Sequence, residues 1–183
     1  MLEVIRERSG AEPLGVVKTL LYRPELFGRP FSEALDAKAI MVAPRPLVLR
    51  SVLEEIVSDT LPPETPVRLD VPRDLAAVAD PLVLERVLSN VLLNAAQHGA
   101  PPIRLTATQR DRKLRVCVED EGGGVPDELR ERLFERFAHG DSRRGTGLGL
   151  AIARTYAQAH GGDLVYHAGR RGACFELIVL QDA

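Results

Sequence analysis

Apolar residues recur along this chain with helical and strand periods, and the pattern is regular from residue 44 onward. Leu49–Ser58 carries apolar residues at helical spacing on one face. Asp80 and Pro81 provide an N-cap and a first-turn proline, which predicts a second helix running to about His98. Two further helices are expected, over Asp127–Phe134 and over Leu148–Ala159.

Segments with a period of two predict the strands. One strand is expected at Val67–Val71, and two more at Ile103–Thr108 and Leu114–Glu119, joined by a polar turn. A last hairpin pairs Leu164–His167 with Ala173–Leu180. This order of elements predicts an α/β (α+β) fold, a two-layer sandwich in which a mixed sheet carries its helices on one face.

The first 43 residues have a different pattern. Two apolar stretches, Leu14–Tyr22 and Phe31–Ile40, are separated by Pro24, Gly28 and Pro30. Two short helices joined by a turn are expected there. We therefore divide the chain into a helical extension at 1–43, which would serve dimerisation or partner docking, and one main domain at 44–183.

Composition narrows the classes of function. With 183 residues, 45% hydrophobic and 27% charged, the chain can bury one main core. Its net charge of -2, with Lys and Arg scattered, argues against a nucleic-acid surface. No apolar run of about 18 residues and no signal-peptide pattern at Met1–Glu7 occur, so we expect a cytoplasmic chain without membrane contact. Cys117 and Cys174 lie in apolar, strand-like runs, where reduced core cysteines are expected rather than a disulfide.

Asn90 and Asn94 lie four residues apart on the helix that begins at Pro81. Leu84 and Leu88 can face the sheet, so the two amides share a neighbouring stripe and reach the same place. A carboxamide oxygen suits Mg²⁺ when nucleotide phosphates and water supply the other ligands. Taken alone, the pair also fits a solvated helix face.

The strand Leu114–Glu119 leads into a glycine run. Its period of two places Asp120 on the same face as Val118, under the asparagine helix. A buried carboxylate needs hydrogen-bond donors, and the amino group of adenine supplies one that guanine does not offer at that place. Gly122 and Gly124 allow the backbone to approach a base closely. An Asp-Gly turn ending a strand is the alternative interpretation.

Gly145, Gly147 and Gly149 alternate where the helix expected from Leu148 begins. The N–H groups and the dipole at a helix N-terminus favour an anion, so this backbone can cradle a triphosphate. The run is neither a P-loop nor a dinucleotide-binding motif, because no Gly-Lys-Ser/Thr follows and the glycine spacing differs.

In this order and spacing, the segments resemble the ATP-binding catalytic domain of sensor histidine kinases. That family shares a Bergerat-type fold with gyrase, mismatch-repair ATPases and one class of heat-shock chaperones. Phe134 and Phe137, otherwise ordinary core anchors, match the family's phenylalanine box. The resemblance covers residues 44–183 and implies ATP and Mg²⁺ as cofactors, with Asn94 as the metal ligand and Asn90 beside it in a catalytic pair. It implies a nucleotide site made of Asn90, Asn94, Gln97, His98, Asp120, Gly122, Gly124, Phe137, Arg143, Arg144, Gly145, Thr146, Gly147, Leu148, Gly149 and Leu150.

The chain departs from the family pattern in two places, and from the hydrolytic relatives in a third. Gln97 stands where the family usually has a basic residue on the phosphates, so Arg143 or Arg144 would meet that charge. Asn90 stands where hydrolytic relatives keep a glutamate general base, which makes hydrolysis poor and transfer the expected chemistry. The segment Ala138–Arg144, which suits a lid over the nucleotide, is shorter than is common in the family.

None of the four histidines has the sequence context of the family's phosphoacceptor. The resemblance therefore implies a module of a bacterial two-component kinase that phosphorylates a histidine on a partner or on a missing dimerisation domain. A response regulator would receive the phosphoryl group next. The chain would be a fragment of a longer kinase or a stand-alone module. An anti-sigma-factor serine kinase and a non-catalytic nucleotide-sensing module are the alternatives.

Overall fold

The computed structural model describes residues 40–138, 147–169 and 171–181. A five-stranded sheet in the order β2, β4, β5, β7, β6 forms its centre. β2 pairs with β4 in parallel and the other neighbours are antiparallel, so the sheet is mixed, as predicted. The strands are β2 (Val67–Asp70), β4 (Ile103–Arg110), β5 (Lys113–Glu119), β6 (Asp163–Ala168) and β7 (Ala173–Leu180).

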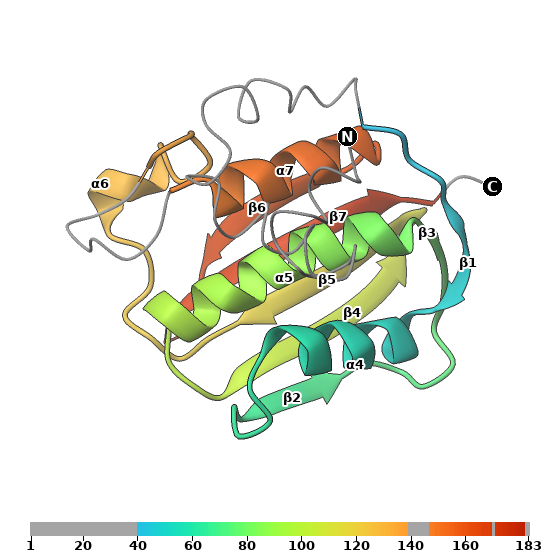
Figure 1. Cartoon of the computed structure of the whole chain (residues 1–183), viewed down its shortest axis with the longest axis horizontal. Helices are drawn as coiled ribbons and strands as arrows, with labels where there is room; N and C mark the ends of the chain where they lie inside the picture. Colours follow the sequence, from blue (N-terminus) through green and yellow to red (C-terminus); the bar gives the residue numbers. More distant parts are fainter. Residues whose placement is uncertain (1–39, 139–146, 170, 182–183) are drawn as a thin grey trace, which may run out of the picture.

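Three helices cover one face of this sheet, with α5 (Pro81–His98) between α4 (Leu49–Thr60) and α7 (Gly149–Ala159) (Figure 1). The two-layer architecture predicted from the sequence is confirmed. Asp80 caps α5 as predicted, because its Oδ1 accepts a hydrogen bond from the backbone N–H of Leu82 at 2.8 Å. Among the described residues, no helix combines the length and the apolar character needed to cross a bilayer.

The core lies between α5 and the sheet. Leu84, Leu88 and Val91 on α5 are buried against Val116 and Val118 on β5. Each fully buried leucine contributes about 1.5–3 kcal/mol relative to an exposed one. The two periodicities in the sequence, 3.6 on α5 and 2 on β5, place these residues on facing surfaces and so determine how the helix sits on the sheet.

A second, two-stranded sheet was missed by the sequence analysis. β1 (Arg45–Val48) and β3 (Ala76–Ala79) pair antiparallel. Proline in β1 and alanine in β3 are poor strand formers, so local propensity gave no signal. Gln181 supports this ladder from the far end of the chain, since its side chain accepts from the N–H of Val78 at 2.8 Å and donates to its carbonyl at 3.1 Å.

The helix predicted over Asp127–Phe134 is shorter in the structure. Only α6 (Asp127–Arg130) is helical, and turns with hydrogen bonds from Arg132 to Leu129 and from Glu135 to Arg132 follow it. Leaving the helix lets Phe134 pack edge-on against Phe175 in the core, with ring centroids 6.4 Å apart. Packing of one aromatic side chain thus outweighs continuation of the helix.

The prediction of two reduced core cysteines is wrong. Cys117 on β5 and Cys174 on β7 form a disulfide. Both lie on the sheet face opposite the helices, since their neighbours Val116, Val118 and Phe175 fill the core. The apolar composition of the two strands concealed this, although the period of two already placed each cysteine on the other face.

Candidate functional site

The three segments singled out in the sequence meet at one end of the sheet. The end of α5, the end of β5 and the start of α7 lie side by side there (Figure 1). The N–H of Glu121, just after β5, donates to the carbonyl of Ala100, just after α5, at 2.8 Å. Asn90 in the middle of α5 lies against Gly149, the first residue of α7. Residues about 60 apart in sequence therefore contribute to one site.

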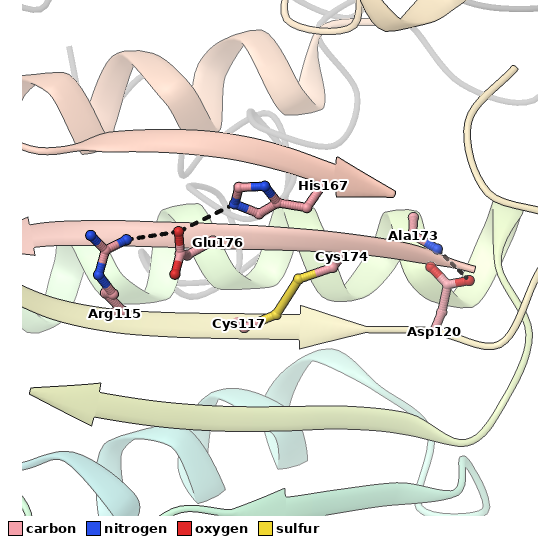
Figure 2. Close-up of a disulfide and its surroundings, with 7 residues drawn as sticks. All are labelled: Arg115, Cys117, Asp120, His167, Ala173, Cys174 and Glu176. Carbon is pink, nitrogen blue, oxygen red and sulfur yellow. Dashed lines mark hydrogen bonds and ion pairs between the residues drawn. A yellow bond between two sulfur atoms is a disulfide. The ribbon is translucent and has the colours of Figure 1, made fainter. Parts of the chain in front are cut away.

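Asp120 is the most buried acidic residue of this site, with 7% of its surface exposed. It continues the buried face of β5, as predicted. Its Oδ1 accepts from the N–H of Gly122 at 2.8 Å. The same oxygen accepts from the N–H of Ala173 at 3.5 Å (Figure 2). The backbone N–H of Asp120 also donates to the carbonyl of Ala173 at 3.1 Å. These bonds hold Asp120 in place, and within the described part of the chain both hydrogen bonds to its carboxylate use Oδ1, which leaves Oδ2 to accept from a ligand.

Glycines surround the Asp120 carboxylate closely. A Cβ placed on Gly99 would lie 2.6 Å from Oδ1, one on Gly172 2.5 Å from the same atom, and one on Gly122 2.7 Å from the Cα of Gly99. Only glycine fits at these three positions without a shift of its neighbours. Gly99 and Gly172 were not predicted from the sequence as part of the site. Their only signal was position, since one directly follows the asparagine helix and the other directly precedes the last strand.

The asparagine pair is placed as predicted on α5, on a partly exposed stripe. Asn90 donates from Nδ2 to the carbonyl of Arg86 at 2.7 Å, and its Oδ1 lies 3.0 Å from where a Cβ of Gly149 would stand. The close approach explains why a glycine begins α7 at this point. Asn94 is half-buried one turn later, while Gln97 and His98 are exposed in the last turn of the helix.

The glycine run before α7 is described only from Gly147 onward, and Arg143, Arg144, Gly145 and Thr146 lie outside the described residues. Gly147 has a φ of +65° and its carbonyl accepts from the N–H of Phe137 at 2.9 Å. Phe137 itself has a φ of +63°, which is unusual for a residue with a side chain, and the residue is 57% exposed. Leu148 is buried and Leu150 half-buried, so both anchor the start of α7.

Gly124, the last glycine of the run after β5, has a φ of +73°, a left-handed conformation that favours glycine. It turns the chain toward β6, where the N–H of Val125 donates to the hydroxyl of Tyr166 at 3.4 Å. The turn carries the chain from the Asp120 end of the sheet into α6.

Arg154 on α7 connects three parts of this end of the molecule, and the sequence analysis gave no signal of it. Its guanidinium donates to both carboxylate oxygens of Asp163 at 2.8 and 3.0 Å and lies 4.9 Å from the ring centroid of Phe134. The hydrogen bond from Arg154 lowers the pKa of Asp163 below its ordinary range, and that same bond raises the pKa of Arg154. The ion pair therefore fixes Phe134 relative to α7.

Known proteins agree with this arrangement. Residues 79–183 match the family model described as histidine kinase-, DNA gyrase B-, and HSP90-like ATPase. The signal transduction histidine-protein kinase AfsQ2 of Streptomyces coelicolor is 36% identical over 121 residues, which cover 63% of this chain and 23% of that protein. The sensor histidine kinase WalK of Bacillus subtilis is 39% identical over 87 residues, 45% of this chain and 14% of that protein. The chain thus spans less than a quarter of the length of these relatives.

Solved structures show the same fold. The ATP binding domain of PrrB from Mycobacterium tuberculosis has a TM-score of 0.63 and 27% identity, over 76% of this chain and 98% of that domain. The histidine kinase domain of the E. coli osmosensor EnvZ has a TM-score of 0.61 and 29% identity, over 77% of this chain and 91% of that domain. Together with the family match, these likenesses show that the chain belongs to the histidine kinase-, DNA gyrase B- and HSP90-like ATPase family.

Proposed function

We propose that residues 44–183 are the ATP-binding catalytic module of a bacterial two-component sensor histidine kinase. The module would transfer the γ-phosphoryl group of ATP to a histidine outside this chain. The main support for the proposal is the buried Asp120 carboxylate, which Gly99, Gly122 and Gly172 surround at the point where α5, β5 and α7 meet. A buried carboxylate with one oxygen left for a ligand is the feature that an adenine-reading site requires.

Adenine fits this end of the molecule. Oδ2 of Asp120 would accept from the exocyclic amino group, while Oδ1 stays bonded to Gly122. The absence of side chains on Gly99, Gly122 and Gly172 lets the backbone pack closely around the carboxylate and hold it in one orientation. Guanine offers no donor at that place, so the site would select ATP.

The triphosphate of ATP would lie along α5 and the start of α7. ATP supplies the phosphoryl group, and Mg²⁺ would offset the phosphate charge. Asn94, half-buried on α5, would be the protein ligand of the metal. The N-terminus of α7, reached through Gly147 and Leu148, would meet the phosphates together with Arg143 or Arg144, which lie outside the described residues.

Asn90 supports transfer rather than hydrolysis. Its amide is held by the Arg86 carbonyl and lies against Gly149. An amide at this place cannot take a proton from water, so it cannot act as a general base. The residues of the site would act by positioning and by electrostatics, which is the main demand of phosphoryl transfer.

The acceptor histidine would belong to another domain or protein. Among the described histidines, His160 accepts at Nε2 from the N–H of Asp80 at 2.8 Å, His167 lies 3.3 Å from Glu176, and His98 is exposed on α5. His139 lies outside the described residues. The partners we propose are therefore a phosphoacceptor histidine domain and, through it, a response regulator, in the cytoplasm. The extension at 1–43 would support a homodimer or docking, and we propose no contact with nucleic acid or membrane.

Incubation of the purified chain with γ-labelled ATP and Mg²⁺, with and without a dimeric helical histidine hairpin from a candidate kinase, tests the proposal. We expect slow turnover and no labelling of the chain alone, and acid-labile label on the hairpin. Acid-stable label on a serine of another protein would indicate an anti-sigma-factor kinase instead. ATP binding without any transfer would indicate a nucleotide-sensing module, and rapid hydrolysis by the chain alone would contradict the proposal.

A further inference from the structure

The sheet face opposite the helices carries a cluster of reactive and charged side chains. On β5, Arg115, Cys117 and Glu119 alternate with the buried core residues. On β7, Cys174 and Glu176 do the same. In the register of the two strands, Cys117 is opposite Glu176, and Glu119 is opposite Cys174. The two cysteines are therefore diagonal neighbours on one face, within reach of each other across the strand pair.

The cysteines are joined by a disulfide, with their Cα atoms 6.4 Å apart (Figure 2). This separation lies in the ordinary range for disulfides, so the strands need no rearrangement to form the bond. Cys117 is half-buried, whereas Cys174 is only 8% exposed. Glu176 beside them is held by Arg115 at 2.9 Å and by His167 at 3.3 Å. Solvent can therefore reach one sulfur of the pair more readily than the other.

The disulfide lies next to the proposed adenine end of the site. Cys174 directly follows Ala173, whose N–H and carbonyl both bond to Asp120. Cys117 lies three residues before Asp120 on the adjoining strand. The cross-link therefore ties together the two strand ends that hold the Asp120 carboxylate. When the cross-link holds those strand ends in place, a ligand does not have to order them on binding. The entropic cost of binding is therefore lower.

We propose that Cys117 and Cys174 are a reversible thiol–disulfide site that a small-molecule disulfide closes, and that closure tightens nucleotide binding at Asp120. The second part rests on the proposed function, because it assumes that Asp120 reads a nucleotide. The first part rests on the two cysteines alone. Neither cysteine takes part in the nucleotide site described above.

The chemistry is two successive thiol–disulfide exchanges. The Cys117 thiolate, as the more accessible sulfur, attacks one sulfur of the oxidant RSSR, which forms a mixed disulfide and releases one thiolate RS⁻. The Cys174 thiolate then attacks the Cys117 sulfur, which forms the intramolecular disulfide and releases the second RS⁻. The released thiolates take up the two protons lost by the cysteines, and two electrons pass from the cysteine sulfurs to the oxidant. Excess reduced thiol reverses both steps.

A metal site is the competing use of the same residues. Ligand atoms of Cys117, Glu119 and Cys174 lie within 4.8 Å of one another. Structural zinc sites have four protein ligands, and within the described residues no fourth ligand joins this group. Two sulfurs already bonded to each other also cannot both bind a metal as thiolates. The structure therefore favours the disulfide over the metal.

The test uses the full chain equilibrated in buffers of oxidised and reduced glutathione. The chain has 2 cysteines, so alkylation followed by mass measurement counts the free thiols directly. We expect two alkylated thiols in reduced protein, none after oxidation, and full recovery on reduction. Calorimetry with ATP and Mg²⁺ should give a Kd about threefold or more lower for the oxidised form. In the variants C117S and C174A, ATP affinity should no longer depend on the glutathione ratio.

Each other outcome contradicts a stated part of the proposal. Thiols that stay alkylatable in oxidised glutathione would overturn the site itself, and an equal Kd in both redox states would overturn the coupling. Binding of Zn²⁺ by reduced protein that prevents closure would replace the disulfide site with a metal site. If neither redox state binds ATP, the proposed function is wrong, and so is the effect of the disulfide on nucleotide binding. The count of free thiols still shows whether Cys117 and Cys174 form a reversible disulfide. If C174A does not fold, the C117S variant alone is compared with the wild type, because Cys117 is the less buried of the two cysteines.

Discussion

Gly99 offers a direct test of whether Asp120 forms the adenine end of the site. The glycine ends the asparagine helix, and its φ of -92° is one that alanine also adopts, so the substitution Gly99→Ala does not force a left-handed φ. The new methyl group would lie 2.4 Å from Cγ and 2.6 Å from Oδ1 of Asp120, and 2.6 Å from the carbonyl oxygen of Ala95. Rotation of the Asp120 side chain relieves the contact with the carboxylate, whereas the contact with the Ala95 carbonyl requires a shift of the backbone at the end of α5.

The size of the effect follows from these distances. Relief of the overlap requires the nearest carboxylate atom, Cγ, to move from 2.4 Å to the 3.4 Å at which ordinary contact begins, which is about 1.0 Å. A shift of that size would break the 2.8 Å hydrogen bond from Gly122 and would misplace the oxygen that accepts from adenine. A hydrogen bond to a charged group contributes about 1.5–3 kcal/mol. We therefore expect the Kd for ATP to rise roughly 10- to 100-fold.

Calorimetric titration of ATP with Mg²⁺ into the wild type and Gly99→Ala measures this change, and circular dichroism checks that the variant is folded. Gly123→Ala is the matched control, because a Cβ at Gly123 meets nothing within 4 Å. Gly123 lies in the loop after β5, next to Gly122, and its substitution should leave the affinity unchanged. A folded Gly99→Ala that binds ATP as tightly as the wild type would refute the assignment of Asp120. Equal losses in both variants would show that the loss of affinity does not come from contact with the Asp120 carboxylate.

Three further predictions concern single groups. Asp120→Asn replaces the free oxygen by an amide or turns the amide toward Gly122, and calorimetry should show ATP binding weaker by about 1–3 kcal/mol in a folded protein; unchanged affinity would remove Asp120 from the site. Asn94→Ala should abolish most of the Mg²⁺ dependence of ATP binding and nearly all transfer to a histidine hairpin, whereas Gln97→Ala, on the exposed last turn, should have a smaller effect. The lowered pKa of Asp163 stabilises the fold above the unfolded-state pKa of an aspartate, about 3.9, and this contribution is lost as pH falls through the still lower folded pKa. Thermal unfolding from pH 7 to pH 3 should therefore show a smaller acid-induced loss of Tm in Asp163→Asn than in the wild type, and identical profiles would show that the Arg154–Asp163 pair adds no net stability.

Local periodicity allowed most of the architecture to be predicted from the sequence. The helical spacing of Leu84 and Leu88 and the alternation of Val116, Val118 and Asp120 each depend on the backbone geometry of one element. That geometry is encoded by neighbouring residues, so α5, β5 and the inward direction of Asp120 could be inferred without knowledge of the rest of the chain. The cap at Asp80 is equally local and was confirmed.

Contacts between distant segments were decided only by the tertiary structure. Gly99 and Gly172 are 73 positions apart, and their crowding of one carboxylate appears only when α5, β5 and β7 are assembled. The disulfide between Cys117 and Cys174, 57 residues apart, depends on the register of β5 against β7, although the alternation of each strand already placed its cysteine away from the core. Register is set by the packing of the whole sheet against its helices, because a slip of one residue would turn every side chain of a strand to the other face. That global condition is absent from any single stretch of sequence.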